Sequence, residues 1–545
     1  MSREILKGTA KVSLLTLISR ALGFVWNLLM ASTFGAGLIS DVFFIAYRIP
    51  NLLRSFLAEG ALTSAFVPVF AEDLNASKEK AQETLSAMTS IIIFIAGMLT
   101  AFGIIFASSL VQLIAPGYEI NSQEFNLCVT LTRISLPYIF FVSLVSLING
   151  SLNNLKIYGA SPVAQISMNC VLIAACWLAS FYEPTLGIYL LTTSVLVGGV
   201  VQVLVQLPAL RRVNLSIIPS KQLLTKSTKK IIYLMIPAIL GAAVYQLNII
   251  INTMLASTLE SGSISWLFYA DRITQLPIGI ITIALASVLL PNLSKNIASD
   301  DTEKFTANLS NSLCYLSFLI IPASVALYAL AEPITKLFFE RGEFSSFDSS
   351  QTYLAIQAIC FGIWGISCYS IVIRAFLAKQ NTTTPALLGI CTLAFNLCIA
   401  LLLMGPLTAV GATGLTAILS SIQNVLYGLS PNANLGHLGL ALSGGLSVSF
   451  SFLIAVYVLR RTCDWPIKNF LLASIKSLIA ALIMLLWIKL IGSFFTNNLL
   501  IILVSIPTAT IIYAFSALFL KSSEARETFS LIKRKYSSGT NRTIK

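Results

Sequence analysis

Histidine and charged residues are scarce in this chain of 545 residues. His437 is the only histidine, and Asp, Glu, Lys and Arg together make up 10% of the sequence. A single histidine argues against the histidine clusters that hold most catalytic metals. The sequence also lacks a Walker loop, an HExxH motif, a nucleophile elbow and a dinucleotide fingerprint. These absences indicate that the chain is not an enzyme and needs no cofactor.

Acidic residues are fewer than basic ones, with 22 Asp and Glu against 35 Lys and Arg, for a net charge of +13. The basic residues lie in short connections between apolar segments rather than in a patch with interleaved aromatics, which argues against nucleic-acid binding. CxxC pairs are absent as well. The nine cysteines lie mostly inside apolar runs, so they are interpreted as small hydrophobic residues and not as disulfides or metal ligands.

Apolar residues are abundant: 56% of the chain is hydrophobic and the mean hydropathy is +0.85. Apolar runs long enough to cross a bilayer recur from end to end, which predicts an all-α polytopic membrane protein with about fourteen transmembrane helices. Prolines at positions 50, 137, 237, 277 and 322 predict bends or unwound turns within these spans. The predicted spans are 12–33, 40–70, 86–114, 125–152, 160–181, 185–209, 231–258, 264–291, 307–330, 352–377, 385–404, 438–459, 469–492 and 498–520.

The basic residues also predict the orientation of the chain. Lys and Arg occur at the N-terminus, in the connections after even-numbered spans and in the tail, whereas connections after odd-numbered spans hold only Lys336 and Arg341. Cytoplasmic loops carry the excess of basic residues, so both termini are predicted to be cytoplasmic. The charged segment Glu340–Glu343 is then expected to form a solvated turn on the outer face.

One apolar segment, 405–434, does not fit a simple count of spans. It is long and apolar enough to be a further crossing. A full crossing would place Arg460, Arg461 and the basic tail outside, against the charge rule. The segment is therefore predicted to be a re-entrant or interfacial helical insertion.

The second predicted span carries four charges within one expected helix, residues 41–70. At about 100° per residue, Asp41, Arg48 and Glu59 fall nearly on one line, while Arg54 points elsewhere. A charge near the bilayer centre costs at least ~2.5–3.5 kcal/mol on insertion scales, so such residues usually face a partner or a wet cavity. Two interpretations stay open, a water-filled transport cavity and a structural network that holds helices together.

Further arginines occur at membrane depth. Arg20 lies in the first span beside Ser19, and Arg272 lies in the eighth. Together with Arg54 they could converge on one central anion, and a diphosphate headgroup would suit several forked cations. The alternative is local pairing of Arg48 with Asp41, Arg54 with Glu59 and Arg272 with Asp271. Arg20 has no acid in its own span.

Several ordered motifs resemble the MurJ (MviN) family of bacterial lipid II flippases, in the multidrug/oligosaccharidyl-lipid/polysaccharide exporter superfamily. The resemblance covers nearly the whole chain. Its motifs are Ser19-Arg-Ala-Leu-Gly-Phe24, Phe34-Gly-Ala-Gly37, Asp41-Val-Phe-Phe44, Arg48-Ile-Pro-Asn-Leu-Leu-Arg54, Ala58-Glu-Gly-Ala61, Tyr269-Ala-Asp-Arg272 and Leu337-Phe-Phe-Glu-Arg-Gly-Glu-Phe344.

The resemblance implies two six-helix lobes around a cationic cavity, followed by two C-terminal helices with a groove for a polyprenyl tail. The expected parts are an N-terminal lobe (1–210), a cytoplasmic connection (211–230), a C-terminal lobe (231–460) containing the 405–434 insertion, the lipid-tail helices (461–520) and a basic cytoplasmic tail (521–545).

The resemblance also assigns expected roles to residues. Arg20, Arg54 and Arg272, with Ser19, are expected to bind the substrate headgroup. Gating or structural charges are expected at Asp41, Arg48, Glu59 and Asp271. The sequence departs from the family where Trp26-Asn27 replaces a common Arg-Asp pair. Asn252 and Asn396 are only weak candidates for the sodium site of some members, because the acidic ligands are missing.

The function that follows is a flippase of the bacterial inner membrane that works by alternating access without a chemical reaction. The expected substrate is undecaprenyl-diphosphate-linked disaccharide-pentapeptide. Membrane lipids and the cell-wall synthesis machinery are the other expected partners, and membrane potential or a monovalent cation would supply energy. Alternatives are a polysaccharide-lipid flippase or drug/cation antiporter of the same superfamily, a membrane-embedded lipid-modifying enzyme, and a scaffold that has lost transport.

Overall fold

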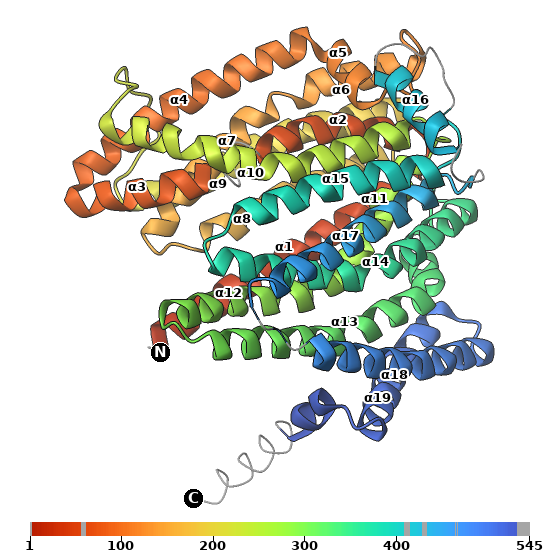
Figure 1. The fold of residues 1–545 in the computed structure, drawn as a ribbon. Helices are drawn as coiled ribbons and strands as arrows, with labels where there is room; N and C mark the ends of the chain where they lie inside the picture. The colour runs from red at the N-terminus through yellow and green to blue at the C-terminus, as the bar shows by residue number, and fades with distance from the viewer. Residues whose placement is uncertain are drawn as a thin grey trace, which may run out of the picture. The chain divides into compact units, whose positions relative to one another are not determined.

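The computed structural model describes residues 3–55, 62–407, 415–427, 433–463, 465 and 467–530. The regular elements in these ranges are all helices (Figure 1). They are α1 (Arg3–Phe34), α2 (Leu38–Arg54), α3 (Leu62–Ala76), α4 (Lys78–Ile105), α5 (Ala107–Ile114), α6 (Gln123–Ser135), α7 (Tyr138–Asn154), α8 (Ala160–Ala179), α9 (Pro184–Arg212), α10 (Lys226–Ser257), α11 (Ser263–Pro277), the π-helix η2 (Ile278–Thr282), α12 (Ile283–Ala298), α13 (Thr302–Phe338), α14 (Ser346–Ala378), α15 (Thr383–Leu403), α16 (Leu415–Tyr427), α17 (His437–Arg460), α18 (Ile467–Phe494) and α19 (Asn498–Phe519).

The all-α membrane fold predicted from the sequence is confirmed. Within the described residues, 12 helical segments are long and apolar enough to cross a membrane, and each matches one of the predicted spans. The predicted spans 40–70 and 231–258 are not among these segments. They correspond to α2 with α3 and to α10. A total of fourteen spans is compatible with this arrangement.

Prolines interrupt two of the long spans. The segment Gln123–Asn154 is divided around Pro137 into α6 and α7, and Pro277 ends α11 just before the π-helical turn η2. Proline has no N–H to donate and clashes with the preceding turn, which accounts for both interruptions. The predicted helix 41–70 is seen as α2 and α3, since residues 56–61, including Glu59, lie outside the described residues.

The chain forms two compact units. Unit 1 contains Met1–Ser265, Arg341–Ser345 and Leu407–Ser420, and unit 2 contains Trp266–Glu340, Ser346–Pro406 and Ser421–Lys545. The two-lobe division expected from the family resemblance stays a prediction. For the candidate site, the consequence is that α1, α2 and α10 belong to unit 1, while Arg272 belongs to unit 2.

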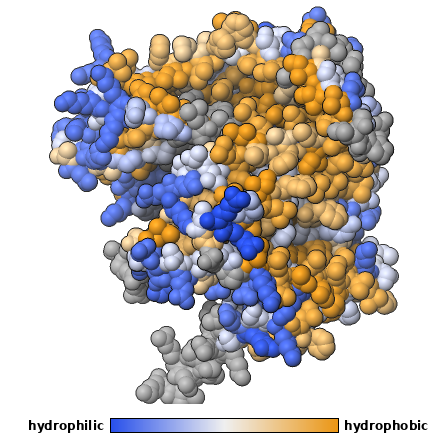
Figure 2. Space-filling view, in the orientation of Figure 1, coloured by the Kyte–Doolittle hydropathy of each residue, from blue (hydrophilic) through white to orange (hydrophobic). Residues whose placement is uncertain are grey.

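Helix packing depends on small residues, and the surface is largely apolar. A Cβ atom on Gly362 of α14 would lie 2.2 Å from the Cα of Gly445 on α17, so these helices touch backbone to backbone. Such close approach is typical of membrane helices. Hydrophobic residues cover much of the face shown in Figure 2. On the last two spans, Leu486, Phe494 and Phe515 are 69%, 73% and 69% exposed, as expected of side chains that face lipid.

The insertion at 405–434 begins and ends at the same place. Leu435 N donates to Leu403 O at 3.0 Å, and Gly436 N donates to Met404 O at 3.1 Å. The residues that leave α15 and those that enter α17 are therefore hydrogen-bonded to each other. A re-entrant or interfacial insertion stays a prediction for this segment.

Candidate functional site

Arg20 lies on the exposed side of α1. Its neighbour Ser19 is buried, and the Ser19 carbonyl accepts a 2.8 Å hydrogen bond from Asn169 Nδ2 of α8. Gly23, one turn later, also faces Asn169. The side of α1 that packs on α8 is therefore occupied by Ser19 and Gly23, and Arg20 projects away from it. Arg20 is exposed, and among the described residues it has no ion-pair partner.

Arg54 ends α2 and is half-buried. Its Nε donates to Asn51 Oδ1 of the preceding turn at 2.7 Å. This bond orients the guanidinium along its own helix. The pairing of Arg54 with Glu59 stays a prediction, because Glu59 lies outside the described residues.

Arg272 and Asp271 lie on α11 in different surroundings. Asp271 is exposed and accepts a 2.6 Å hydrogen bond from Gln275 Nε2. The guanidinium carbon of Arg272 lies 4.5 Å from the centre of the Phe268 ring, one turn back on the helix. The Nε atom of Arg272 is buried and has no hydrogen-bond partner in the described part of the chain. An arginine N–H in this position can donate a charge-assisted hydrogen bond to an anionic acceptor.

Asp41, at the start of α2, is 3% exposed and binds the start of α11. Its carboxylate accepts hydrogen bonds from Gly262 N at 2.7 Å, Ser265 N at 2.8 Å and Ser265 Oγ at 2.5 Å. The first N–H groups of a helix have no partners within the helix and favour a negative charge. Asp41 thus caps α11 from another helix, which offsets the cost of burying its charge.

Arg48, about two turns after Asp41 on α2, bonds to α10. Its Nη1 donates to Thr253 Oγ1, and Thr253 Oγ1 in turn donates to Ile249 O at 2.7 Å. Beyond Arg48, Gln246 Nε2 of α10 donates to Ser55 Oγ at 2.6 Å. Polar contacts therefore join α2 and α10 at several levels. The roles predicted for Asp41, Arg48, Arg20 and Arg272 stay predictions.

The weak sodium candidates each take part in hydrogen bonds. Asn252 Nδ2 donates to Asn248 Oδ1 of the same helix at 3.2 Å. Asn396 of α15 is fully buried, and its Oδ1 accepts from Ser443 Oγ of α17 at 3.0 Å. Within the described residues, no group of three or more His, Cys, Asp or Glu side chains could hold a metal ion. Coupling to sodium stays untested.

The segment 341–345, which belongs to unit 1, contacts the end of α1. Glu343 N donates to Ser32 O at 2.9 Å. Gly342 has φ +61°, and a Cβ there would lie 2.2 Å from Ser32 O, so both the conformation and the space require glycine. The prediction of a solvated turn therefore fits the side chains of this segment but not its backbone. The side chains of Arg341 and Glu343 are exposed, but the backbone packs tightly and Phe344 is buried.

The connection between α9 and α10, predicted to be cytoplasmic, lies along α4. Gln82 exchanges two hydrogen bonds with the Ser216 backbone, donating from Nε2 to the carbonyl at 2.8 Å and accepting from the N–H at 2.9 Å. Two turns further on, Ser220 N donates to Ser90 Oγ at 2.7 Å. The start of α10 is thereby fixed to the first helices of unit 1.

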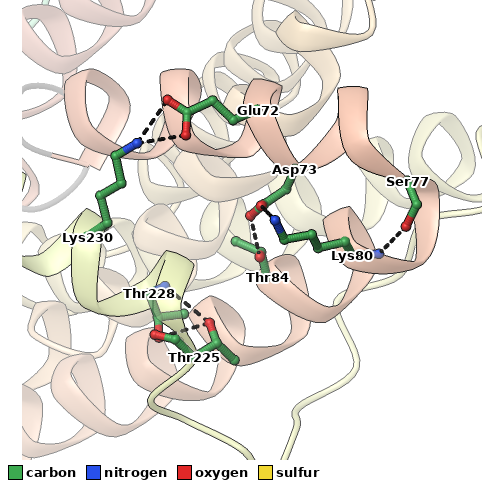
Figure 3. A network of polar contacts seen from close by, with 8 residues as sticks. All are labelled: Glu72, Asp73, Ser77, Lys80, Thr84, Thr225, Thr228 and Lys230. Carbon is green, nitrogen blue, oxygen red and sulfur yellow. Dashed lines mark hydrogen bonds and ion pairs between the residues drawn. The ribbon is translucent and has the colours of Figure 1, made fainter.

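A polar network continues this attachment at the end of α3 (Figure 3). Asp73 is 3% exposed, accepts from Thr84 Oγ1 at 2.7 Å and pairs with Lys80 Nζ at 3.0 Å. Beside it, Glu72 pairs with Lys230 of α10 at 2.7 Å in an exposed position. Burial raises the pKa of Asp73, but hydrogen bonds from Ser227, Thr84 and Lys80 outweigh it, so the pKa lies below its ordinary value.

The lowered pKa predicts how stability depends on pH. Asp73 stabilises the fold above the pKa of an unfolded aspartate, about 3.9, and this contribution is lost as pH falls through the lower folded pKa. We expect D73N to reduce the free energy of unfolding at pH 7 by about 1–3 kcal/mol, as for hydrogen bonds to a charged group. Thermal unfolding of the purified wild-type and D73N proteins measures this loss of stability.

The neighbouring carboxylate provides the control. E72Q removes an exposed pair worth about 0–1 kcal/mol and should change the unfolding temperature little. The difference between D73N and wild type should shrink as pH falls below the pKa of an unfolded aspartate, about 3.9. An equal effect of E72Q, or a D73N effect that does not decrease as the pH is lowered, would contradict this account of the network.

Sequence reasoning missed the uncharged partners of the charged helix. Gly262, Ser265 and Thr253 hold Asp41 and Arg48, yet they lie more than 200 residues away in the sequence. The serines at positions 263 and 265, shortly before the Tyr269-Ala-Asp-Arg272 motif, are a helix-start signal that could have indicated a capping site.

Comparison with known proteins places these residues in a family. The family description "Lipid II flippase MurJ" matches residues 30–428. A "Lipid II flippase MurJ" of Burkholderia cenocepacia is 35% identical over 457 residues, which is 83% of each chain. A "Probable lipid II flippase MurJ" of Vibrio cholerae is 33% identical over 414 residues, covering 73% of this chain and 77% of the relative.

Solved structures agree. One described as "Lipid II flippase MurJ, inward closed conformation" has a TM-score of 0.74 and 26% identity, with 95% of this chain and 99% of that chain covered. An inward-facing multidrug resistance MATE family transporter of the MOP superfamily has a TM-score of 0.61 at 15% identity, covering 81% of this chain and 95% of that one, and shares the fold alone. By family match, relatives and fold, the chain belongs to the MurJ family of lipid II flippases.

Proposed function

We propose that this chain moves the lipid-linked peptidoglycan precursor lipid II from the inner to the outer leaflet of the bacterial inner membrane by alternating access. The names of its relatives support the substrate. The main observation in support of the proposed binding site is the buried Nε of Arg272. This cationic donor has no hydrogen-bond partner among the described residues. A diphosphate oxygen would supply the missing acceptor.

Arg20 and Arg54 complete the proposed headgroup site, with Ser19 beside Arg20. Lipid II carries a diphosphate, and forked guanidinium groups bind phosphate oxygens with two parallel hydrogen bonds. A guanidinium also keeps its charge at any physiological pH, so the affinity of the site would not depend on titration. Convergence of the three arginines on one anion is part of the proposal.

Asp41 and Arg48 have a different proposed role. Asp41 binds the N-terminus of α11 and Arg48 binds α10, so both hold α2 against the helices that follow the α9–α10 connection. In alternating access these bonds would form in one state and break in the other. Asp271, Glu59 and their neighbours would then contribute charge to the moving helices rather than to the substrate.

The hydrocarbon tail would stay in lipid, beside α18 and α19. These helices pack on α13 through Tyr513 Oη, which donates to Phe318 O at 2.7 Å, and they expose large apolar side chains on the other side. No chemical step is involved. Membrane potential would drive the cycle, since each charge that crosses 100 mV contributes about 2.3 kcal/mol. A monovalent cation and contacts with the cell-wall synthesis machinery are further parts of the proposal.

Complementation tests the proposed substrate. The chain is expressed in a bacterium depleted of its own lipid II flippase, with its membrane level measured by immunoblot. Rescue of growth and of cell shape is the expected result. Failure to rescue at a normal membrane level would overturn lipid II as substrate. It would favour another exporter function of the same superfamily, either a polysaccharide-lipid flippase or a drug/cation antiporter.

A further inference from the structure

The described part of the insertion that follows α15 contains one short helix, α16, with three distinct faces. Its 13 residues, Leu415–Tyr427, rise about 20 Å, too little to cross a hydrocarbon core of about 30 Å. The helix is amphipathic, and none of its residues is charged. The role of α16 can therefore be inferred from the surroundings of each of its faces.

The first face binds the protein. Gln423 is 2% exposed, and its Nε2 donates to Leu401 O at 2.9 Å and to Gly405 O at 2.8 Å. Leu401 lies in the last turn of α15, whose carbonyls have no partners within the helix, and Gly405 follows just after the helix ends. Leu419, one turn earlier on the same face, is 8% exposed. Gln423 thus fixes α16 at the end of a membrane span.

The second face is apolar and exposed. Ile418, Ile422 and Val425 are spaced by four and three residues, so they form one stripe, and they are 56%, 37% and 71% exposed. On the remaining face, Ser421 and Asn424 are exposed polar residues. One face of α16 thus packs on the protein, a second is apolar and a third is polar. This arrangement suits the boundary between lipid and water, where the apolar face can contact lipid and the polar face can contact water.

We infer that α16 lies in the plane of the membrane interface and binds the lipid surface through Ile418, Ile422 and Val425. The positions of Leu401 and Gly405 at the end of the α15 span place the helix at that depth. Because α16 has no charged residue, its binding depends on apolar burial and not on anionic lipid. The helix holds the connection between α15 and α17 against the bilayer, on the face that the basic residues predict to be external.

Site-specific photocrosslinking tests this inference. A diazirine-bearing amino acid replaces Ile422 or Asn424 in the full-length protein, which is reconstituted in vesicles of phosphatidylethanolamine and phosphatidylglycerol. Lipid adducts are then counted by mass spectrometry. Leu486 of α18, 69% exposed on a membrane span, serves as the positive control. We expect adducts at Ile422 comparable to those at Leu486 and at least five times more abundant than those at Asn424.

Two outcomes overturn the inference. One is equal adduct yield at Ile422 and Asn424, which would mean that the stripe does not face lipid. The other is crosslinking of Ile422 to protein, which would assign the stripe to a protein interface. Substitution at Val425 repeats the test if the Ile422 variant does not accumulate in the membrane. Replacing phosphatidylglycerol by phosphatidylcholine should leave the yield unchanged, because binding through apolar burial does not need anionic lipid.

Discussion

R272A is expected to reduce lipid II export at least tenfold while the protein stays in the membrane at a normal level. The Nε of Arg272 is buried and has no partner among the described residues, so its removal leaves no acceptor of the protein unsatisfied. Besides its contact with the Phe268 ring, the variant loses the bonds that the guanidinium makes with a ligand. Each hydrogen bond to a charged group contributes about 1.5–3 kcal/mol, and about 1.4 kcal/mol corresponds to a factor of ten.

Two further variants show whether the effect of R272A comes from the charge and the planar shape of the guanidinium or from the loss of any membrane-embedded arginine. R272K keeps the positive charge but loses the planar fork, so export should fall to an intermediate value. R133A removes an exposed arginine of α6, whose Nε donates to Ile104 O at 3.4 Å, and should leave export unchanged. Growth of the depleted strain and lipid II on the outer leaflet are the measurements. Normal export by R272A would remove Arg272 from the site.

D41A is expected to abolish export and to lower stability. Asp41 is the acceptor for the Gly262 and Ser265 N–H groups and for the Ser265 hydroxyl, all of which are buried with it. Each buried donor left without a partner costs about 1–3 kcal/mol. Thermal unfolding of the purified variant, compared with its export rate in cells, measures the two effects.

The matched variant S265A distinguishes a gating role from a structural one. It removes one donor to Asp41 and keeps the carboxylate and both backbone bonds, so stability should fall by about 1 kcal/mol. A structural role predicts that export follows stability in D41N and S265A. A gating role predicts that export falls further than stability does. Wild-type stability and export in D41A would contradict both roles.

Much of the fold could be predicted from the sequence, because the thickness of the bilayer sets the length of the apolar helices that cross it. Each of the 12 crossing segments found in the described residues matches a predicted span. Proline chemistry predicted the interruption at Pro137 and the irregular turn after Pro277. Five of the nine cysteines are buried, as is common for small hydrophobic residues: Cys128, Cys176, Cys314, Cys360 and Cys368.

The contacts of the charged residues could not be predicted from the sequence in the same way. Helical spacing relates residues three or four apart, and it could reveal the placement of Arg272 over Phe268. It cannot reveal that Asp41 binds Gly262 and Ser265, since the partners are uncharged and distant in sequence. The same holds for Gly342, whose backbone packs on Ser32, and for Gln423, which binds the end of α15.

The most direct test of the proposed function is the rate at which lipid II reaches the outer leaflet. Cells depleted of their own flippase express either this chain or its R272A variant at matched levels, and newly made lipid II is followed by its accessibility to an impermeant lipid II-cleaving toxin. The proposal predicts rapid exposure with the wild-type chain and at least tenfold slower exposure with R272A. Equal exposure by both chains would contradict the arginine site, and no exposure by either would contradict the flippase function.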